Sequence, residues 1–149
     1  MFDFSALLTL FSEKFHHSPT ILASAPGRIN LAGEHVDYNE GVVLPVAIDR
    51  YVYVAAAPTE DETVTILARD LGETVVFRLD QLAQRLDANG KALPSWALYP
   101  AGVAWVLQEA GYPIAGMQAV LTGNLPIAAG LGSSAAVEVA FAFTWRALG

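Results

Sequence analysis

Residues 133–148, SSAAVEVAFAFTWRAL, restrict the fold of this chain more than any other segment. Glu138 and Arg146 are the charged side chains in it, and the others are small or apolar nearly all round a helix. Such a helix is stable only when other elements cover it on several sides. We therefore predict a helix that ends at the cap residue Gly149, packs against a layer of the fold, and leaves an apolar face that needs a partner.

The segments before this helix contain several runs with the apolar and β-branched character of strands. These runs are residues 21–25, one or two strands within 41–58, a hairpin of ETVTILARD and ETVVFRLD around Leu71-Gly72, and residues 117–122. We expect Pro26-Gly27 to stop the first strand and Pro45 to bend or end the second, because proline removes a ladder hydrogen bond.

Two further segments have helical patterns. Phe4, Leu7, Leu8, Phe11 and Phe15 recur at helical spacing and predict an amphipathic helix over 3–16. A second helix is predicted from Trp96 to about Ala110, and residues 80–90 are predicted to be briefly helical. Strands come mostly before helices, with a mixed order later, so the sequence predicts one α+β domain over 1–149 and not a repeating βαβ fold.

The composition excludes several classes of protein. The chain has 149 residues, of which 54% are hydrophobic, and 15 Asp+Glu against 8 Lys+Arg give a net charge of −7. This balance argues against nucleic-acid and anionic-membrane partners. The absence of cysteine excludes disulfides and thiolate metal sites. With neither a signal-peptide pattern nor a long apolar run, we expect a cytoplasmic protein.

GNLPIAAGLGSSAA, residues 123–136, is a glycine-rich loop that leads into the last predicted helix. Gly130 and Gly132 leave the backbone open, and Ser133 and Ser134 begin the helix. The free N–H groups and the positive dipole end of a helix N-terminus bind phosphate. A serine hydroxyl there is also a suitable ligand for the Mg²⁺ that accompanies a nucleotide.

Three other interpretations of this loop are considered. In the first interpretation, the loop is a plain turn whose serine caps the helix, and the loop sequence alone does not exclude it. GLGSSA also fits a dinucleotide-binding pattern, but a long loop separates it from the strand and the expected acidic residue does not follow. A Walker A loop is excluded because Gly-Lys-Ser/Thr is missing.

GRINLAGEHVDY, residues 27–38, gathers polar groups in an otherwise apolar chain. Arg28 supplies a permanent planar cation suited to phosphate or to an ionised carboxylate. Glu34, His35 and Asp37 supply acceptors of the kind that bind sugar hydroxyls. The alternative is a capped turn with a surface ion pair between Arg28 and Glu34 or Asp37.

The two motifs together resemble a known family. APGRINLAGEHVDYNEGVVLPVAID looks like the galactokinase signature, and LPIAAGLGSSAAVEVA resembles the second motif of the GHMP small-molecule kinases. LPSWALYPAGV is similar to the stretch that galactokinases place between them. Order and spacing agree over essentially the whole chain, and two long motifs in register are a specific signal.

The resemblance implies a fold and a site. The fold is the N-terminal GHMP kinase domain, which resembles domain 2 of ribosomal protein S5, with a mixed sheet, packed helices and an incomplete core. In galactokinases the residues matching Glu34, His35 and Asp37 bind sugar hydroxyls, and Arg28 matches an arginine beside the catalytic carboxylate. The matches to the ATP site are Trp96 near adenine and the phosphate loop Gly130, Leu131, Gly132, Ser133, Ser134 and Ala135, with Ser134 as the Mg²⁺ contact.

The implied reaction is ATP-dependent phosphorylation of the anomeric hydroxyl of galactose. The aspartate that accepts the sugar proton in galactokinases lies downstream of the second motif, beyond Gly149. We therefore expect an N-terminal piece of a kinase that lacks catalysis by itself and self-associates through its apolar face. A sugar- and ATP-binding sensor and a sister kinase for arabinose, galacturonate or N-acetylgalactosamine remain alternatives, since Gly132 stands where galactokinases often carry serine.

Overall fold

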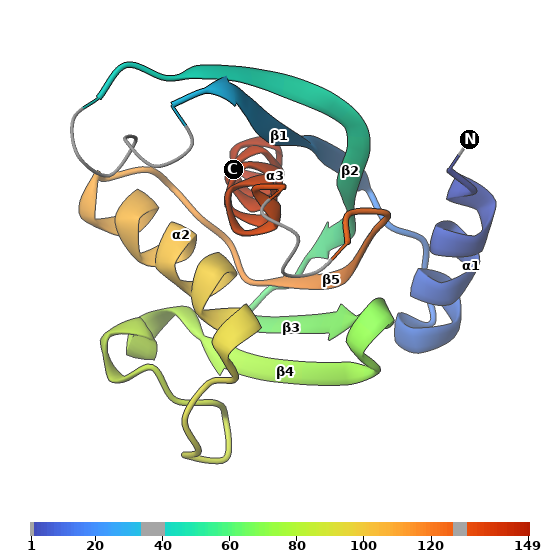
Figure 1. Ribbon diagram of the computed structural model, residues 1–149. Coiled ribbons are helices and arrows are strands. Elements are labelled where there is room, and N and C mark those ends of the chain that lie inside the picture. Colours follow the sequence, from blue (N-terminus) through green and yellow to red (C-terminus); the bar gives the residue numbers. More distant parts are fainter. Residues whose placement is uncertain (1, 34–40, 127–130) are drawn as a thin grey trace.

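The computed structural model describes residues 2–33, 41–126 and 131–149, and within these ranges the chain is an α+β domain (Figure 1). Its longer elements are α1 (Phe4–Phe15), β1 (Ile21–Ala32), β2 (Leu44–Pro58), β3 (Thr63–Ala68), β4 (Glu73–Arg78), α2 (Leu98–Glu109), β5 (Met117–Gly123) and α3 (Ser133–Leu148). Short 3-10 helices are η2 (Arg69–Leu71), η3 (Leu79–Gln84) and η4 (Ser95–Ala97). In this part of the chain, no helix has the length and apolar character needed to cross a membrane.

The strands form one mixed sheet in the order β1-β2-β5-β3-β4. The pairs β1/β2, β2/β5 and β3/β4 are antiparallel, whereas β3 and β5 are parallel. A parallel pair needs a crossover, and the segment between β4 and β5 that contains α2 completes it. The predicted α+β class, the mixed sheet and the hairpin of β3 and β4 are confirmed.

Strand β2, which lies between β1 and β5 in the sheet, is covered on both faces over residues 52–57. Val52, Val54 and Ala56 belong to the main core with α2 and α3, while Tyr53 and Ala55 belong to a second core with α1. Figure 1 shows α1 on the side of the sheet away from α2 and α3. Burial on both faces explains why this part of the sequence is continuously apolar and does not alternate. Burial also raises the pKa of the Tyr53 hydroxyl, and the neighbouring Tyr51 adds to the rise.

Helix α3 packs against β1, β2 and α2. Its buried side chains recur along one broad stripe: Ala136, Ala140, Phe141, Thr144 and Trp145. The Trp145 indole N–H donates to the Ala115 carbonyl at 3.1 Å. The predicted burial is therefore confirmed on the side that faces the sheet, whereas Val139 and Phe143 on the same helix remain 44% and 54% exposed.

The prediction that Pro26-Gly27 ends the first strand is wrong, because β1 continues through them to Ala32. Strand β1 lies at the edge of the sheet, where a missing proline N–H costs no ladder hydrogen bond on the open side. The register with β2 shifts between Pro26 and Arg28, where Gly27 alone lies opposite residues 48–50, so the two extra residues of β2 form a bulge. Pro45 likewise lies inside a single strand, opposite Asn30 near a second irregularity.

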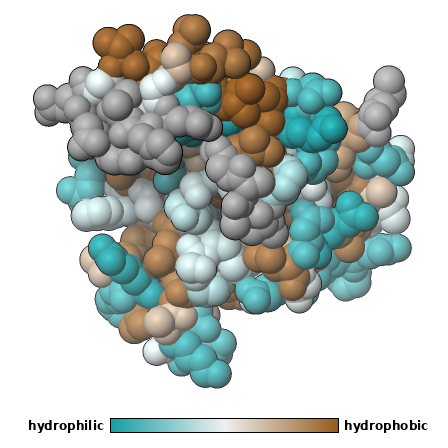
Figure 2. Space-filling model, in the orientation of Figure 1, coloured by the Kyte–Doolittle hydropathy of each residue, from teal (hydrophilic) through white to brown (hydrophobic). Residues whose placement is uncertain are grey.

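The outer part of this two-stranded ribbon carries exposed apolar side chains. Leu31 is 61% exposed, Leu44 56% and Val46 40%. Figure 2 shows apolar surface where β2 crosses the top of the molecule. The ribbon thus leads from the buried sheet to the first motif, which begins within β1.

Candidate functional site

The first contact between the two motifs joins β1 to the segment before α3. The backbone N–H of Arg28 donates to the carbonyl of Leu131 at 2.9 Å. These residues are 103 positions apart in the sequence (131 minus 28). The fold therefore places the start of the first motif against the end of the glycine-rich loop, as a shared site requires.

Gly27 makes this approach possible. A Cβ added at Gly27 would lie 2.8 Å from the Leu131 carbonyl oxygen and would contact the side chain of Leu125. Separations below about 3 Å between such atoms are repulsive, so even alanine would push the loop away from β1. Gly27 is buried, and its role is to let two backbones pack closely.

Gly132 begins the last helix. It adopts a left-handed conformation with φ of 67° and is the N-cap of α3, which starts at Ser133 as predicted. The alternative with a serine N-cap is wrong, because the cap position is occupied by glycine. The N–H groups of the first helical turn have no acceptor within the helix, which makes this end of α3 suitable for an anion.

The side chain of Arg28 lies at this helix end. A Cβ added at Gly132 would be 2.7 Å from Nη1 of Arg28, so the guanidinium rests on the N-cap backbone. A cation beside the positive end of a helix dipole is unfavourable by itself, and an anion near both groups removes the repulsion. The donor set of Arg28 and the first turn of α3 therefore fits a phosphate group.

A metal ion at this site needs oxygen ligands. Ser133, Ser134 and Ala135 are partly buried in the first turn of α3. Across residues 2–33, 41–126 and 131–149, no group of three or more His, Asp or Glu side chains is placed to hold a metal. The hydroxyl of Ser134 together with nucleotide oxygens is the arrangement that suits Mg²⁺, and this role stays a prediction.

Four of the predicted site residues lie outside the described ranges. They are Glu34, His35, Asp37 and Gly130. Gly33, the last described residue before them, has a φ of 86°, which favours glycine. The roles of these four residues in binding sugar and phosphate stay predictions.

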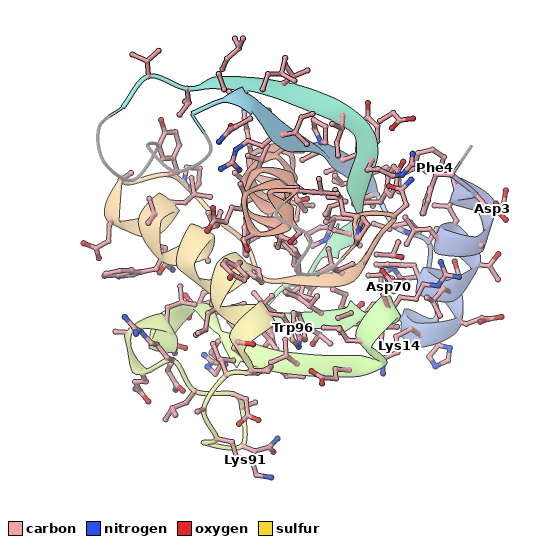
Figure 3. The ribbon with its side chains drawn as sticks, in the orientation of Figure 1. Asp3, Phe4, Lys14, Asp70, Lys91 and Trp96 are labelled. Atoms are coloured by element: carbon pink, nitrogen blue, oxygen red, sulfur yellow. The ribbon has the colours of Figure 1, made fainter. Side chains whose placement is uncertain are left out.

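Trp96 lies in a different part of the fold. Its indole N–H donates to Glu73 Oε2 at 2.6 Å, and its ring packs against the main core. Glu73 belongs to β4, at the opposite edge of the sheet from β1 and Arg28. Figure 3 shows Trp96 near the first turn of α2. The structure thus gives Trp96 a packing role, and its place beside adenine stays a prediction.

Two residues that the sequence did not single out hold the start of the glycine-rich loop. Asn124 bonds to both backbone groups of Tyr51, and Asp70 bonds to Thr122 and Gly123. Asparagine after a strand-ending glycine is a recognisable turn signal in the sequence. Its partner, 73 positions away, becomes visible only through the register of β2 and β5.

Comparison with known proteins agrees with this geometry. The galactokinase galactose-binding signature matches residues 9–58, and the GHMP kinases N terminal domain matches residues 99–148. The first match contains Gly27 and Arg28, and the second contains Leu131 and Gly132. The two matched regions are therefore those that meet at the candidate site.

Similar proteins align with nearly the whole chain. A galactokinase of Roseiflexus sp. is 40% identical over 148 residues, which are 99% of this chain and 36% of that protein. The crystal structure of Lactococcus lactis galactokinase complexed with galactose has a TM-score of 0.79 at 35% identity, covering 93% of this chain and 35% of that one. Mevalonate kinase of Methanococcus jannaschii shares the fold, with a TM-score of 0.65 at 20% identity over 82% of this chain and 38% of that one. The chain thus spans little more than a third of the length of these relatives.

Proposed function

We propose, from the premise that this chain belongs to the galactokinase family of GHMP kinases, that it forms the sugar- and ATP-binding part of a galactose kinase. The reaction proposed for the whole protein is transfer of the γ-phosphoryl group of ATP to the anomeric hydroxyl of galactose. In this proposal the chain binds and orients the two substrates. In this proposal, the group that accepts the sugar proton lies in the part of galactokinases that this chain does not span.

The junction of Arg28 with the α3 N-terminus carries this proposal. The hydrogen bond from the Arg28 N–H to Leu131 and the guanidinium against Gly132 put a cation and free helix N–H groups together. A phosphoryl group that is being transferred needs this kind of charge neutralisation and fixed orientation. The sugar-binding signature continues along the chain from Arg28, and in this proposal it brings the hydroxyl that is phosphorylated next to the phosphate.

Each group has a proposed role in that arrangement. Glu34, His35 and Asp37 accept or donate hydrogen bonds to the sugar hydroxyls and set the orientation of the ring. The backbone of residues 130–135 and the Arg28 guanidinium hold the phosphates. Mg²⁺, with Ser134 as a ligand, neutralises phosphate charge when it is bound with ATP. Trp96 is the proposed neighbour of the adenine ring.

Titration of the 149-residue chain with galactose, followed by two-dimensional amide NMR, tests the proposal. Galactose is expected to shift the amide signals of residues 28–38, because their side chains and backbone surround the sugar. Mg²⁺-ATP is expected to shift residues 131–135, at the helix end that binds phosphate. Glucose, which differs in one hydroxyl configuration, is the control and is expected to leave both sets unchanged.

The outcomes separate the alternatives. If the signals are well dispersed and neither sugar shifts them, galactose is not the substrate and a sister kinase for another sugar is favoured. A response to galactose without one to Mg²⁺-ATP contradicts the kinase and leaves a sugar-binding protein. Shifts confined to residues remote from both motifs contradict the site assignment itself.

We further propose that the 149-residue chain by itself pairs with a second copy through the outer face of α2 and α3. Trp105 and Val106 on α2 and Phe143 on α3 are 47%, 61% and 54% exposed, and Tyr112 just beyond α2 is 63% exposed. A contiguous exposed apolar surface such as this one, formed by two helices, favours burial against another protein surface. Val106→Glu is expected to convert the pair to a monomer in light scattering after gel filtration.

Val42→Glu is the matched control for this prediction. Val42 is 93% exposed and lies just before β2, in a segment that belongs to neither α2 nor α3. The same apolar-to-acidic change there is expected to leave the mass of the particle unchanged. A wild-type chain that is monomeric at micromolar concentration contradicts the proposal directly.

A further inference from the structure

Asn124 lies in one row of the sheet with Tyr51 and Pro26. The pairing of β2 with β5 ends at Val52 and Gly123, so Asn124 comes opposite Tyr51 in the next row. On its other side, Tyr51 pairs with Pro26 of β1. Gly27, which contacts Leu125 and Leu131, directly follows Pro26. This row therefore connects Asn124, at the start of the glycine-rich loop, to the irregular pairing at Gly27, where Leu131 at the end of the loop packs.

The contact between Asn124 and Tyr51 is reciprocal. The Tyr51 N–H donates to Oδ1 of Asn124 at 2.7 Å, and the Asn124 N–H donates to the Tyr51 carbonyl at 3.0 Å. Both backbone groups of Tyr51 on this side are thereby satisfied by one residue. Oδ1 takes the place of the Asn124 backbone carbonyl, which would accept from the Tyr51 N–H in a regular antiparallel pair, so the backbone is free to leave the sheet after Asn124.

Asp70, which follows β3, binds the last two residues of β5 on the side of β5 opposite β2. Strand β3 pairs with β5 only as far as Ala68 and Leu121, so Thr122 and Gly123 extend beyond its end. The Asp70 carboxylate accepts from Thr122 Oγ1 at 3.0 Å and from the Gly123 N–H at 2.9 Å. Figure 3 shows Asp70 at the end of β3. A side chain here replaces the backbone acceptors that β3 no longer supplies.

We propose that Asn124 is a positioning residue for the phosphate-binding segment, with Asp70 as its support. Asn124 sets the point and direction at which the chain leaves β5. Pro126 then restricts Leu125 to extended conformations, so this direction is carried forward. At the far end, Leu131 accepts from the Arg28 N–H and Gly132 begins α3. In this proposal the direction set at Asn124 helps to hold Leu131 against Arg28, and with it the first turn of α3, whose free N–H groups face a phosphate.

This proposal has a consequence at a distance. If Asn124 fixes the loop, its loss loosens the other end, where the Arg28 amide bonds to Leu131. A residue that only stabilises its own turn would leave that amide protected. The amide of Val54, which lies three residues from Tyr51 within the buried part of β2, reports general loosening of the sheet.

Amide hydrogen exchange in Asn124→Ala tests whether Asn124 positions the glycine-rich loop. Exchange at Arg28 is expected to become about tenfold faster, the effect of losing one hydrogen bond, with Val54 unchanged. Asn124→Asp keeps an acceptor oxygen for the Tyr51 N–H and is expected to restore wild-type exchange at Arg28. Asn89→Ala, the same change in an exposed turn, is the matched control. Unchanged exchange at Arg28 in Asn124→Ala overturns the proposal, as does equal acceleration at Val54.

A second test, which measures the affinity for Mg²⁺-ATP, rests on the proposed function. Asn124→Ala is expected to raise the Kd for Mg²⁺-ATP about five- to tenfold and to leave the Kd for galactose within about twofold. Equal loss of both affinities, or no loss of either, overturns the positioning role. If the wild-type chain binds galactose but not Mg²⁺-ATP, the kinase proposal fails, and exchange at Arg28 still decides whether Asn124 fixes the loop.

Discussion

Gly27→Ala is expected to destabilise the domain and to separate the two motifs. The added Cβ would lie 2.8 Å from the Leu131 carbonyl oxygen, a backbone atom that cannot rotate away, and would also contact the Leu125 side chain. Overpacking of a close contact costs about 1–3 kcal/mol. Each kcal/mol lowers the Tm of a domain this size by roughly 2–4 °C. Thermal unfolding measures the loss, and faster amide exchange at Arg28 locates it.

Gly102→Ala is the matched control for this substitution. Gly102 lies within α2, and an added Cβ there meets no atom within 4 Å among the described residues. Alanine is favoured over glycine in a helix by about 0.5–1 kcal/mol, so this variant is expected to be as stable as wild type or more so. If Gly27→Ala unfolds at the wild-type temperature, β1 and the loop do not approach as closely as the fold requires.

Asp37→Ala is expected to abolish galactose binding, and Ser134→Ala is expected to weaken Mg²⁺-ATP binding while galactose affinity is retained. Removing an ionised partner of a sugar hydroxyl costs about 1.5–3 kcal/mol, which is more than tenfold in Kd. Loss of one hydroxyl ligand weakens Mg²⁺ only in its complex with the nucleotide. Calorimetric titration of each variant with each ligand gives the four affinities.

Controls for this pair are available in the same chain. Asp49→Ala removes a carboxylate whose side chain is 91% exposed and paired only with the adjacent Arg50 among the described residues, so galactose binding is expected to persist. Ser95→Ala removes an exposed hydroxyl from η4 and is expected to leave Mg²⁺-ATP binding intact. Normal galactose binding by Asp37→Ala would show that the first motif does not bind the sugar.

Local chemistry alone predicted most of the elements. Phenylalanines at helical spacing predicted α1, the hairpin around Gly72 predicted β3 and β4, and the glycine and serines before residue 135 predicted the start of α3. These features are visible in sequence because helix periodicity, turn glycines and caps depend on neighbouring residues. The two motifs and their family were likewise recognisable, because each motif is a continuous stretch.

Tertiary structure decided how those stretches are joined. Pro26-Gly27 has the local character of a turn, yet the open edge of the sheet accepts the proline, and the approach of Leu131 requires the glycine. Asn124 has the local character of a turn residue, and only the register of β2 against β5 brings it to Tyr51. Sequence by itself singled out the residues that are predicted to carry the chemistry. Strand register, which depends on contacts between residues far apart in the chain, decided that Arg28 meets the end of the glycine-rich loop.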